Sequence, residues 1–385
     1  MASSPKSLKP AERVAIQQQD VWSIINEAAA ESLIQPVANM GQGFFDYNPP
    51  DFAINAAKDA LDRVDCNQYA PTKGRSSLRK SIAREYLLSF NRELDPDTEV
   101  TVTTGANEGD EVVLFEPFFD QYISNIEMAG GIIRYVPLSA PQENTLRTSS
   151  AEWTIDFKKL NDSFNEGTKM IHDVLILSDE VYDRLCYVPF TRTATLSEEV
   201  FSHTLTVGSA GKAFQATGWR IGYLVGPDHL IKYVAAAHTR ICYSSVSPLQ
   251  EAVDVPFDKA NQVGFWDYSQ REMKRKLDMF IQVFDELKIP YSYPEGGYFV
   301  LANMASIKLP EDYPFPLHIS SRPRNFKIAY FLIRELGVAG IPVSEFYKEQ
   351  TTVAATNYLR FAVCKTDEVL EQAKTKLQQL KKYMV

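Results

Sequence analysis

Apolar and polar residues alternate along the middle of the chain in two different patterns. Short apolar runs typical of buried strands occur at residues 132–136, 175–177, 204–207 and 221–225, and helical stretches separate them. Helical spacing of apolar residues is clearest at Leu78, Ile82 and Tyr86. A second apolar stripe, near the end of the chain, contains Val369, Leu370, Ala373, Leu377 and Leu380. Alternating strands and helices predict an α/β fold with a mostly parallel sheet.

After residue 280 the pattern changes. A Gly-containing run at 294–300 is followed by a helical stretch at 326–336 and an apolar strand at 358–363. This order predicts a smaller α+β unit, and the alternative is one continuous domain.

The composition indicates a globular protein and excludes several classes. With 385 residues and 45% hydrophobic content, the chain can bury a large core. A formal net charge of −9 provides no basic surface, so we expect no nucleic-acid partner. No apolar run reaches the length of a membrane span, and residues 1–6 contain no hydrophobic signal core, so we expect no membrane association.

The cysteines bear on both metal binding and location. Their positions, Cys66, Cys186, Cys242 and Cys364, show neither paired spacing nor a nearby histidine cluster. We therefore expect no disulfide framework and no metal site, which fits a reducing compartment. The cytoplasm is the predicted location. A mitochondrial location is the alternative, although acidic residues dilute the positive charge of the N-terminal segment.

Lys212 is the most informative single residue. It follows the apolar run 204–207 in a turn of small residues, where a desolvated lysine amine loses its proton readily and becomes a nucleophile for a carbonyl-bearing cofactor. Ser209 and Arg220 flank it with a neutral donor and a fork of charged donors, a combination that suits a phosphate group. The alternative is a solvated surface lysine in an ordinary loop.

A second cluster lies at the end of the run 173–182. Asp179 follows a strand-like segment, and open α/β sheets bind ligands at the carboxyl ends of their strands. A carboxylate at this edge could pair with a protonated ring nitrogen, and Tyr182 could hydrogen-bond a phenolic oxygen. The alternative is that Asp179 and Glu180 merely cap a following helix.

Seven segments in order resemble those of one known family, the fold-type I pyridoxal-phosphate aminotransferases, and within it the kynurenine and glutamine transaminase branch. They are 40–44 (MGQGF), 67–69 (NQY), 104–109 (TGANEG), 115–120 (FEPFFD), 178–182 (SDEVY), 209–222 (SAGKAFQATGWRIG) and 358–361 (YLRF). The resemblance covers nearly the whole chain. It implies a large cofactor-binding α/β domain at 46–279. It also implies a small α+β domain formed by the N-terminal arm, 1–45, together with 280–385.

The resemblance implies a role for each cofactor contact. Lys212 would attach covalently to pyridoxal 5′-phosphate and shuttle a proton. Asp179 would hold the pyridinium nitrogen and Tyr182 the O3′ oxygen, while Phe119 would stack on the ring. The phosphate would be bound by the backbone amides of Ala106 and Asn107, by Ser209 and Arg220, and by Tyr69 of a second subunit in a homodimer. Phe119 and Tyr69 could instead be packing residues.

The substrate contacts follow from the same resemblance. Arg360 would grip the substrate carboxylate, the backbone of Gly43 would assist it, and Trp22 would form a wall of the side-chain site. Arg360 could instead satisfy an internal carboxylate, and Trp22 could be a core aromatic.

The chain departs from the family at two places. Residues 100–102 and 110–115 read as strands, yet parallel neighbours need a crossover of about a dozen residues. The family has a helix after the position of Gly109, with its N-terminus at the phosphate. Near Ile171 the family has a strand, an Asn-Pro loop and a helix, and no residue here matches that asparagine. The two losses should reduce core burial and cofactor affinity.

We therefore predict a ping-pong transaminase that moves the amino group of an aromatic or glutamine-like L-amino acid, with kynurenine favoured, to a 2-oxo acid. One alternative is a β-lyase for cysteine conjugates. Another is a shortened, inactive homologue that acts as a dimer partner. A nicotinamide-dependent enzyme is disfavoured because no Gly-x-Gly-x-x-Gly turn follows an early strand.

Overall fold

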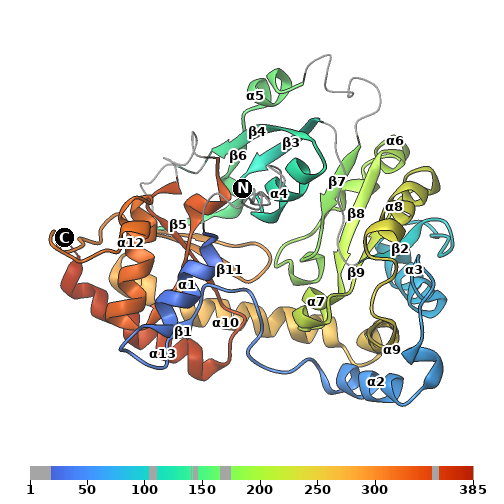
Figure 1. The fold of residues 1–385 in the computed structure, drawn as a ribbon, viewed down its shortest axis with the longest axis horizontal. Helices are drawn as coiled ribbons and strands as arrows, with labels where there is room; N and C mark the ends of the chain where they lie inside the picture. Colours follow the sequence, from blue (N-terminus) through green and yellow to red (C-terminus); the bar gives the residue numbers. More distant parts are fainter. Residues whose placement is uncertain are drawn as a thin grey trace, which may run out of the picture.

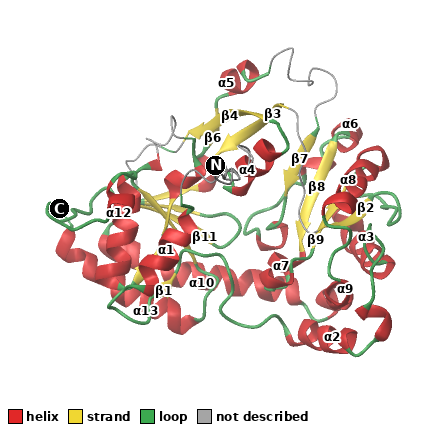
Figure 2. Ribbon diagram, in the orientation of Figure 1, coloured by secondary structure: helices red, strands yellow, loops and turns green. Residues whose placement is uncertain are grey.

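The computed structural model describes residues 19–103, 111–139, 141, 146–164, 175–348 and 355–384. Four sheets and the helices around them make up this part of the chain (Figures 1 and 2). Every apolar run that predicted a strand overlaps a strand among the described residues, which confirms the α/β prediction. Among the described residues, no helix combines the length and apolar character needed to cross a bilayer.

A four-stranded sheet has the order β2-β9-β8-β7. Its strands are β2 (Val100–Thr103), β9 (Gly222–Val225), β8 (Thr204–Ser209) and β7 (Ile176–Asp179). β7 and β8 are parallel, and β9 runs antiparallel to both of its neighbours, so three of the four strands point the same way. The helices of this region are α2 (Asp51–Leu61), α3 (Ser76–Phe90), α6 (Glu198–Ser202), α7 (Ala210–Ala213), α8 (Asp228–Ile241) and α9 (Ser247–Gln262).

A three-stranded sheet lies beside it, with the order β3-β4-β6. Its strands are β3 (Glu111–Glu116), β4 (Ile132–Ser139) and β6 (Thr154–Ile155). Helix α4 (Gln121–Met128) connects the parallel strands β3 and β4, and α5 (Phe157–Asp162) follows β6. Since β2 and β3 belong to different sheets, the short link between them does not have to cross between parallel neighbours.

The region between these two sheets is poorly covered. Leu175 and Leu177, at the β7 edge, are 50% and 53% exposed, and Ile132 of β4 is also exposed. Helix α4 buries no residue. Apolar side chains of a sheet normally lie under a neighbouring strand or helix, and these exposed residues are where the expected loss of core burial would fall.

A five-stranded sheet is built mainly from the C-terminal part of the chain, in the order β13-β14-β11-β10-β5. Its strands are β13 (Ile341–Pro342), β14 (Tyr358–Ala362), β11 (Phe299–Asn303), β10 (Tyr291–Tyr293) and β5 (Arg147–Ser149). Strand β1 (Ala38–Asn39) pairs with β12 (Val338–Ala339), so the N-terminal arm joins this unit. Its helices are α1 (Val21–Ala30), α10 (Phe265–Leu287), α11 (Leu317–Ser320), α12 (Arg324–Phe331) and α13 (Asp367–Leu377).

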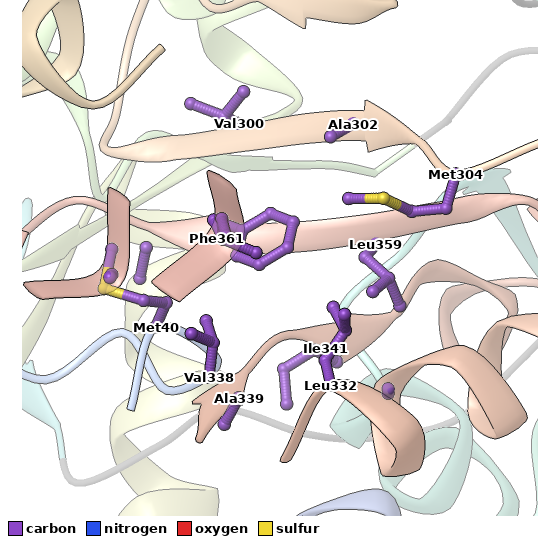
Figure 3. Close-up of a cluster of buried hydrophobic side chains, with 14 of the residues drawn as sticks. Met40, Val300, Ala302, Met304, Leu332, Val338, Ala339, Ile341, Leu359 and Phe361 are labelled. Atoms are coloured by element: carbon purple, nitrogen blue, oxygen red, sulfur yellow. The ribbon is translucent and has the colours of Figure 1, made fainter. Parts of the chain in front are cut away.

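One apolar core holds this unit together (Figure 3). Met40 of the arm packs with Val300, Leu359 and Phe361, which come from two adjacent strands. Long helix α10 contributes one buried face that includes Met273, Leu277, Phe280, Phe284 and Leu287. This spacing of three and four residues is the amphipathic pattern of a helix that covers a sheet.

Candidate active site

Lys212 lies in α7, directly after the carboxyl end of β8. The Ser209 side chain caps this one-turn helix by accepting the backbone N–H of Lys212 at 3.4 Å. The ε-amine is mostly buried and donates a hydrogen bond to the Tyr298 hydroxyl at 3.2 Å. Burial lowers the pKa of the Lys212 amine, because desolvation penalises the charged form. This environment is that of a reactive amine and does not match a solvated surface lysine.

Asp179 and Tyr182 lie at the neighbouring strand end. Asp179 is the register partner of Val207 on β8, so its carboxylate lies at the same sheet edge as the Lys212 turn. The Tyr182 ring lies 5.7 Å from the Lys212 amine, and burial raises the pKa of its phenol to about 12. The following short helix, η4 (Asp183–Leu185), receives no side-chain cap, although Asp179 Oδ1 accepts the backbone N–H of Val181 at 3.3 Å.

Glu180 points away from this edge into a buried ion network. It pairs with Arg192, and it accepts hydrogen bonds from the Ser178 hydroxyl at 2.9 Å and the Thr193 amide at 3.1 Å. Arg192 also pairs with Asp183 at 2.8 Å. The network anchors the chain on both sides of Tyr182 and so fixes the loop that carries Asp179.

Arg360 of β14 is a partly buried cation that faces aromatic rings. Its guanidinium carbon lies 4.1 Å from the Phe299 ring centre and 4.5 Å from that of Phe346. Burial lowers the pKa of Arg360 to about 10. Its Nε atom is buried and has no hydrogen-bond partner among the described residues. An arginine whose buried Nε donor is unused is suited to bind an anion.

Trp22 of α1 lies near the Arg360 guanidinium. Its indole N–H donates to Asp120 Oδ2 at 2.9 Å, and its ring lies 5.9 Å from the Arg360 guanidinium. The other oxygen of Asp120 is buried without a partner in the described structure. Asp120 therefore holds Trp22 in place and adds negative charge beside Arg360.

Gly43 and Phe119 have different neighbours. A Cβ on Gly43 would come within 2.6 Å of the Phe299 ring, so glycine is required for the close approach of the arm. Phe119 is 50% exposed and packs edge-on against Tyr122, with 5.6 Å between ring centres. Tyr122 donates a hydrogen bond to the Asp179 carboxylate. Phe119 and Asp179 are therefore connected through Tyr122.

The expected phosphate ligands are only partly described. Arg220 is exposed, has a left-handed backbone with φ 58°, and donates to the Thr217 carbonyl at 3.2 Å. Tyr69 is 86% exposed and packs edge-on against Tyr243. Ala106 and Asn107 lie outside the described residues.

Three residues near the site were missed by the sequence reasoning: Tyr298, Asp120 and Tyr122. Asp120 lies within the segment 115–120, and Tyr298 within the run 294–300, so both segments were noticed without a role for these side chains. Their chemistry depends on partners far away in the sequence, which spacing does not reveal.

Comparison with known proteins agrees with this geometry. The model of the family described as "Aminotransferase class I and II" matches residues 35–172 and 168–377. A protein named a probable kynurenine–oxoglutarate transaminase, from Saccharomyces cerevisiae, is 45% identical over 95% of this chain and 93% of its own length. The kynurenine–oxoglutarate transaminase of Dictyostelium discoideum is 31% identical over 98% and 97%.

The fold is also that of a solved relative. The crystal structure of Bna3p from Saccharomyces cerevisiae matches with a TM-score of 0.94 at 44% identity, covering 99% of this chain and 100% of that one. The alignment to the yeast transaminase spans 414 positions, more than the 385 residues of this chain, so the relative has internal residues that this chain lacks. The match to the family is in two pieces that meet at 168–172, where the second loss was expected. The chain belongs to the class I and II aminotransferase family.

Proposed function

We propose that this aminotransferase uses pyridoxal 5′-phosphate, attached to Lys212, to move the amino group of kynurenine to a 2-oxo acid such as oxoglutarate. The observation that carries the proposal is Arg360, whose buried Nε donor is unused and which lies beside the arm, the Lys212 turn and Trp22. The names of the relatives at 45% and 31% identity support kynurenine as the donor and oxoglutarate as the acceptor.

The residues present fit this cofactor chemically. A buried amine with a lowered pKa suits attachment to an aldehyde, and the Asp179 carboxylate at the adjacent strand end suits a protonated ring nitrogen. When bound, pyridoxal phosphate supplies an electron-withdrawing ring that stabilises charge developing at the substrate α-carbon. Lys212 then holds and returns the proton that leaves this carbon. Its lowered pKa keeps more of the amine unprotonated than an ordinary lysine would have.

The other contacts complete the cofactor site. We assign Tyr182 to the phenolic oxygen, Phe119 to the ring face, and Ser209 and Arg220 to the phosphate, together with the backbone amides of Ala106 and Asn107. Tyr69 would come from a second copy in a homodimer. Its exposure, and that of its neighbours Tyr243 and Val246, fits a surface that a partner subunit covers.

Substrate recognition rests on charge and on an aromatic wall. The Arg360 fork would bind the α-carboxylate in two contacts, with the Gly43 backbone beside it. An amino acid and a 2-oxo acid share this carboxylate, so one arginine serves both half-reactions, as a ping-pong mechanism requires. Trp22, fixed by Asp120, would lie against the aromatic side chain.

The test uses the full chain, purified and saturated with pyridoxal phosphate. We expect kynurenine and 2-oxoglutarate together to give glutamate, and Lys212→Ala to abolish both this activity and the borohydride-sensitive absorption of the bound cofactor. Turnover of an aliphatic amino acid comparable with that of kynurenine would remove the support for aromatic preference. Pyruvate release from a cysteine conjugate without an oxo-acid acceptor would favour the β-lyase alternative.

The second candidate is a shortened subunit that pairs with a full-length relative. The exposed β7 edge and the match to the family in two pieces favour it, because both indicate missing parts beside the cofactor site. A protein that remains colourless with excess pyridoxal phosphate, yet forms mixed dimers with a full-length relative, would support this candidate. For either function the cytoplasm is the proposed location, with the mitochondrion as the alternative.

A further inference from the structure

Tyr298 lies directly before β11 and is fully buried. Its ring packs edge-on against Tyr182 at 5.2 Å and against Phe45 at 5.4 Å, and it contacts Phe299 at 4.8 Å between ring centres. The ring is therefore held on three sides by aromatic neighbours. Its hydroxyl has one fixed place, between the N-terminal arm and the Lys212 turn.

The hydroxyl of Tyr298 has a defined set of partners. It donates to the Gly43 carbonyl oxygen at 3.0 Å, and the Lys212 amine donates to it at 3.2 Å. A phenol carries one proton and two lone pairs. Since the Gly43 carbonyl takes that proton, the oxygen faces Lys212 as an acceptor.

An acceptor at this position fixes the orientation of the amine. One N–H of Lys212 is committed to Tyr298, so the amine does not rotate freely on its four-carbon stem. The other groups that act on the amine are ionisable side chains from several elements: Asp179, Tyr182, Arg220, Arg360 and Cys364. Tyr298 is the one side chain for which the described structure gives a direct hydrogen bond to it.

We propose that Tyr298 is a positioning residue for Lys212: it accepts one N–H of the amine and connects the amine to the backbone of Gly43. This inference rests on the proposed role of Lys212 as the reactive amine. The N-terminal arm would then have a second role. Gly43, proposed to lie at the substrate carboxylate, is connected to the Lys212 amine through the Tyr298 hydroxyl.

The test measures the amine itself, in the full chain without cofactor. Acetic anhydride acetylates unprotonated amines, and mass spectrometry of the peptide that contains Lys212 gives the acetylation rate at each pH. Tyr298→Phe keeps the ring but removes the acceptor that stabilises the charged form. We expect the midpoint of the acetylation profile to fall by about half to one pH unit.

Tyr291→Phe is the matched control. Tyr291 is also a buried tyrosine of this sheet, but its hydroxyl donates to Asp285 at 3.0 Å. We expect its profile to equal that of the wild type. An unchanged midpoint in Tyr298→Phe, or an equal shift in both variants, would overturn the proposal. If Tyr298→Phe fails to fold, 3-fluorotyrosine at 298 keeps shape and hydroxyl, and as a weaker acceptor should move the midpoint in the same direction.

The two proposals fail separately in this design. If Lys212 never binds pyridoxal phosphate but its acetylation profile responds to Tyr298, the proposed function fails and the positioning role stands. If Lys212 binds the cofactor and the profile does not respond, the reverse holds.

Discussion

Replacing Arg360 with methionine should stabilise the ligand-free protein while destroying its activity. Burial lowers the pKa of Arg360 from 12.5 to about 10. Because a tenfold change in an ionisation constant is about 1.4 kcal/mol, keeping this guanidinium charged costs the folded protein about 3 kcal/mol. Stacking on Phe299 and Phe346 returns about 0.5 to 1 kcal/mol each. We therefore expect Arg360→Met to raise the free energy of unfolding by about 1 to 2 kcal/mol.

The effect on catalysis has the opposite sign. Removing one partner of a buried charge pair costs about 2 to 5 kcal/mol, which corresponds to a fall in kcat/KM between about 30-fold and several thousand-fold. Both substrates should be affected, because both present a carboxylate to this arginine. The assays are kcat/KM for kynurenine and for 2-oxoglutarate, and urea denaturation of the cofactor-free protein.

Arg324→Met is the matched control. Arg324 lies in the same unit, but its guanidinium donates to the Met304 carbonyl at 3.1 Å, the Asn357 side chain at 2.9 Å and the Ile307 carbonyl at 2.5 Å. Its loss should lower stability and leave KM unchanged. If Arg360→Met lowers stability as Arg324→Met does, Arg360 is already satisfied in the free protein and the reasoning is wrong. Unchanged kcat/KM would show that it does not bind the carboxylate.

Three further outcomes follow from particular contacts. Asp120→Ala should raise KM for kynurenine by about tenfold, because it releases the Trp22 indole. Asp20→Ala, which removes the cap of α1, should leave KM unchanged. Both are measured by steady-state kinetics, and equal KM values for the two variants would refute the role of Asp120. Because burial lowers the pKa of Lys212 below 10.5, the unfolded chain binds more protons as pH approaches that value. The cofactor-free wild type should therefore gain stability over Lys212→Met as pH rises toward 10.5, measured by urea denaturation, and a difference independent of pH would contradict this. Leu177→Ala should lower the free energy of unfolding by about 1 kcal/mol or less, and Leu205→Ala by about 2 to 5 kcal/mol. The two residues are register partners, but of the two only Leu205 is buried. Equal losses of stability in urea denaturation would mean that the β7 edge is covered.

The strands and the placement of Lys212 and Asp179 were predictable from the sequence. Both residues follow short apolar runs, and parallel strands bring their carboxyl ends to one edge, so β7 and β8 deliver them together. The roles of these side chains stay predictions. What the sequence indicated was which chemical groups meet at this edge.

The contacts that orient these groups were not predictable. Trp22 and Asp120 are 98 positions apart, and Lys212 and Tyr298 are 86 apart. Each pair forms only because the C-terminal unit, with the arm packed on it, docks against the edges of the other two sheets. No periodicity within a single element encodes such a contact, and the unpartnered donor of Arg360 likewise depends on which distant side chains fail to reach it.

The four-stranded and three-stranded sheets are separate, so a cofactor bound between them would have to hold them together. Asp179 ends the edge strand β7, whereas Phe119 and Tyr122 follow β3 of the other sheet, and the hydrogen bond from Tyr122 to Asp179 connects them. A ring held by Asp179 on one side and Phe119 on the other would bridge both sheets at a place where apolar side chains are exposed. Binding would then also be a packing event, and a ligand that binds only the folded form stabilises it by RT ln(1 + [L]/Kd). In this chain, cofactor affinity and the order of the β3–β4 region should rise and fall together.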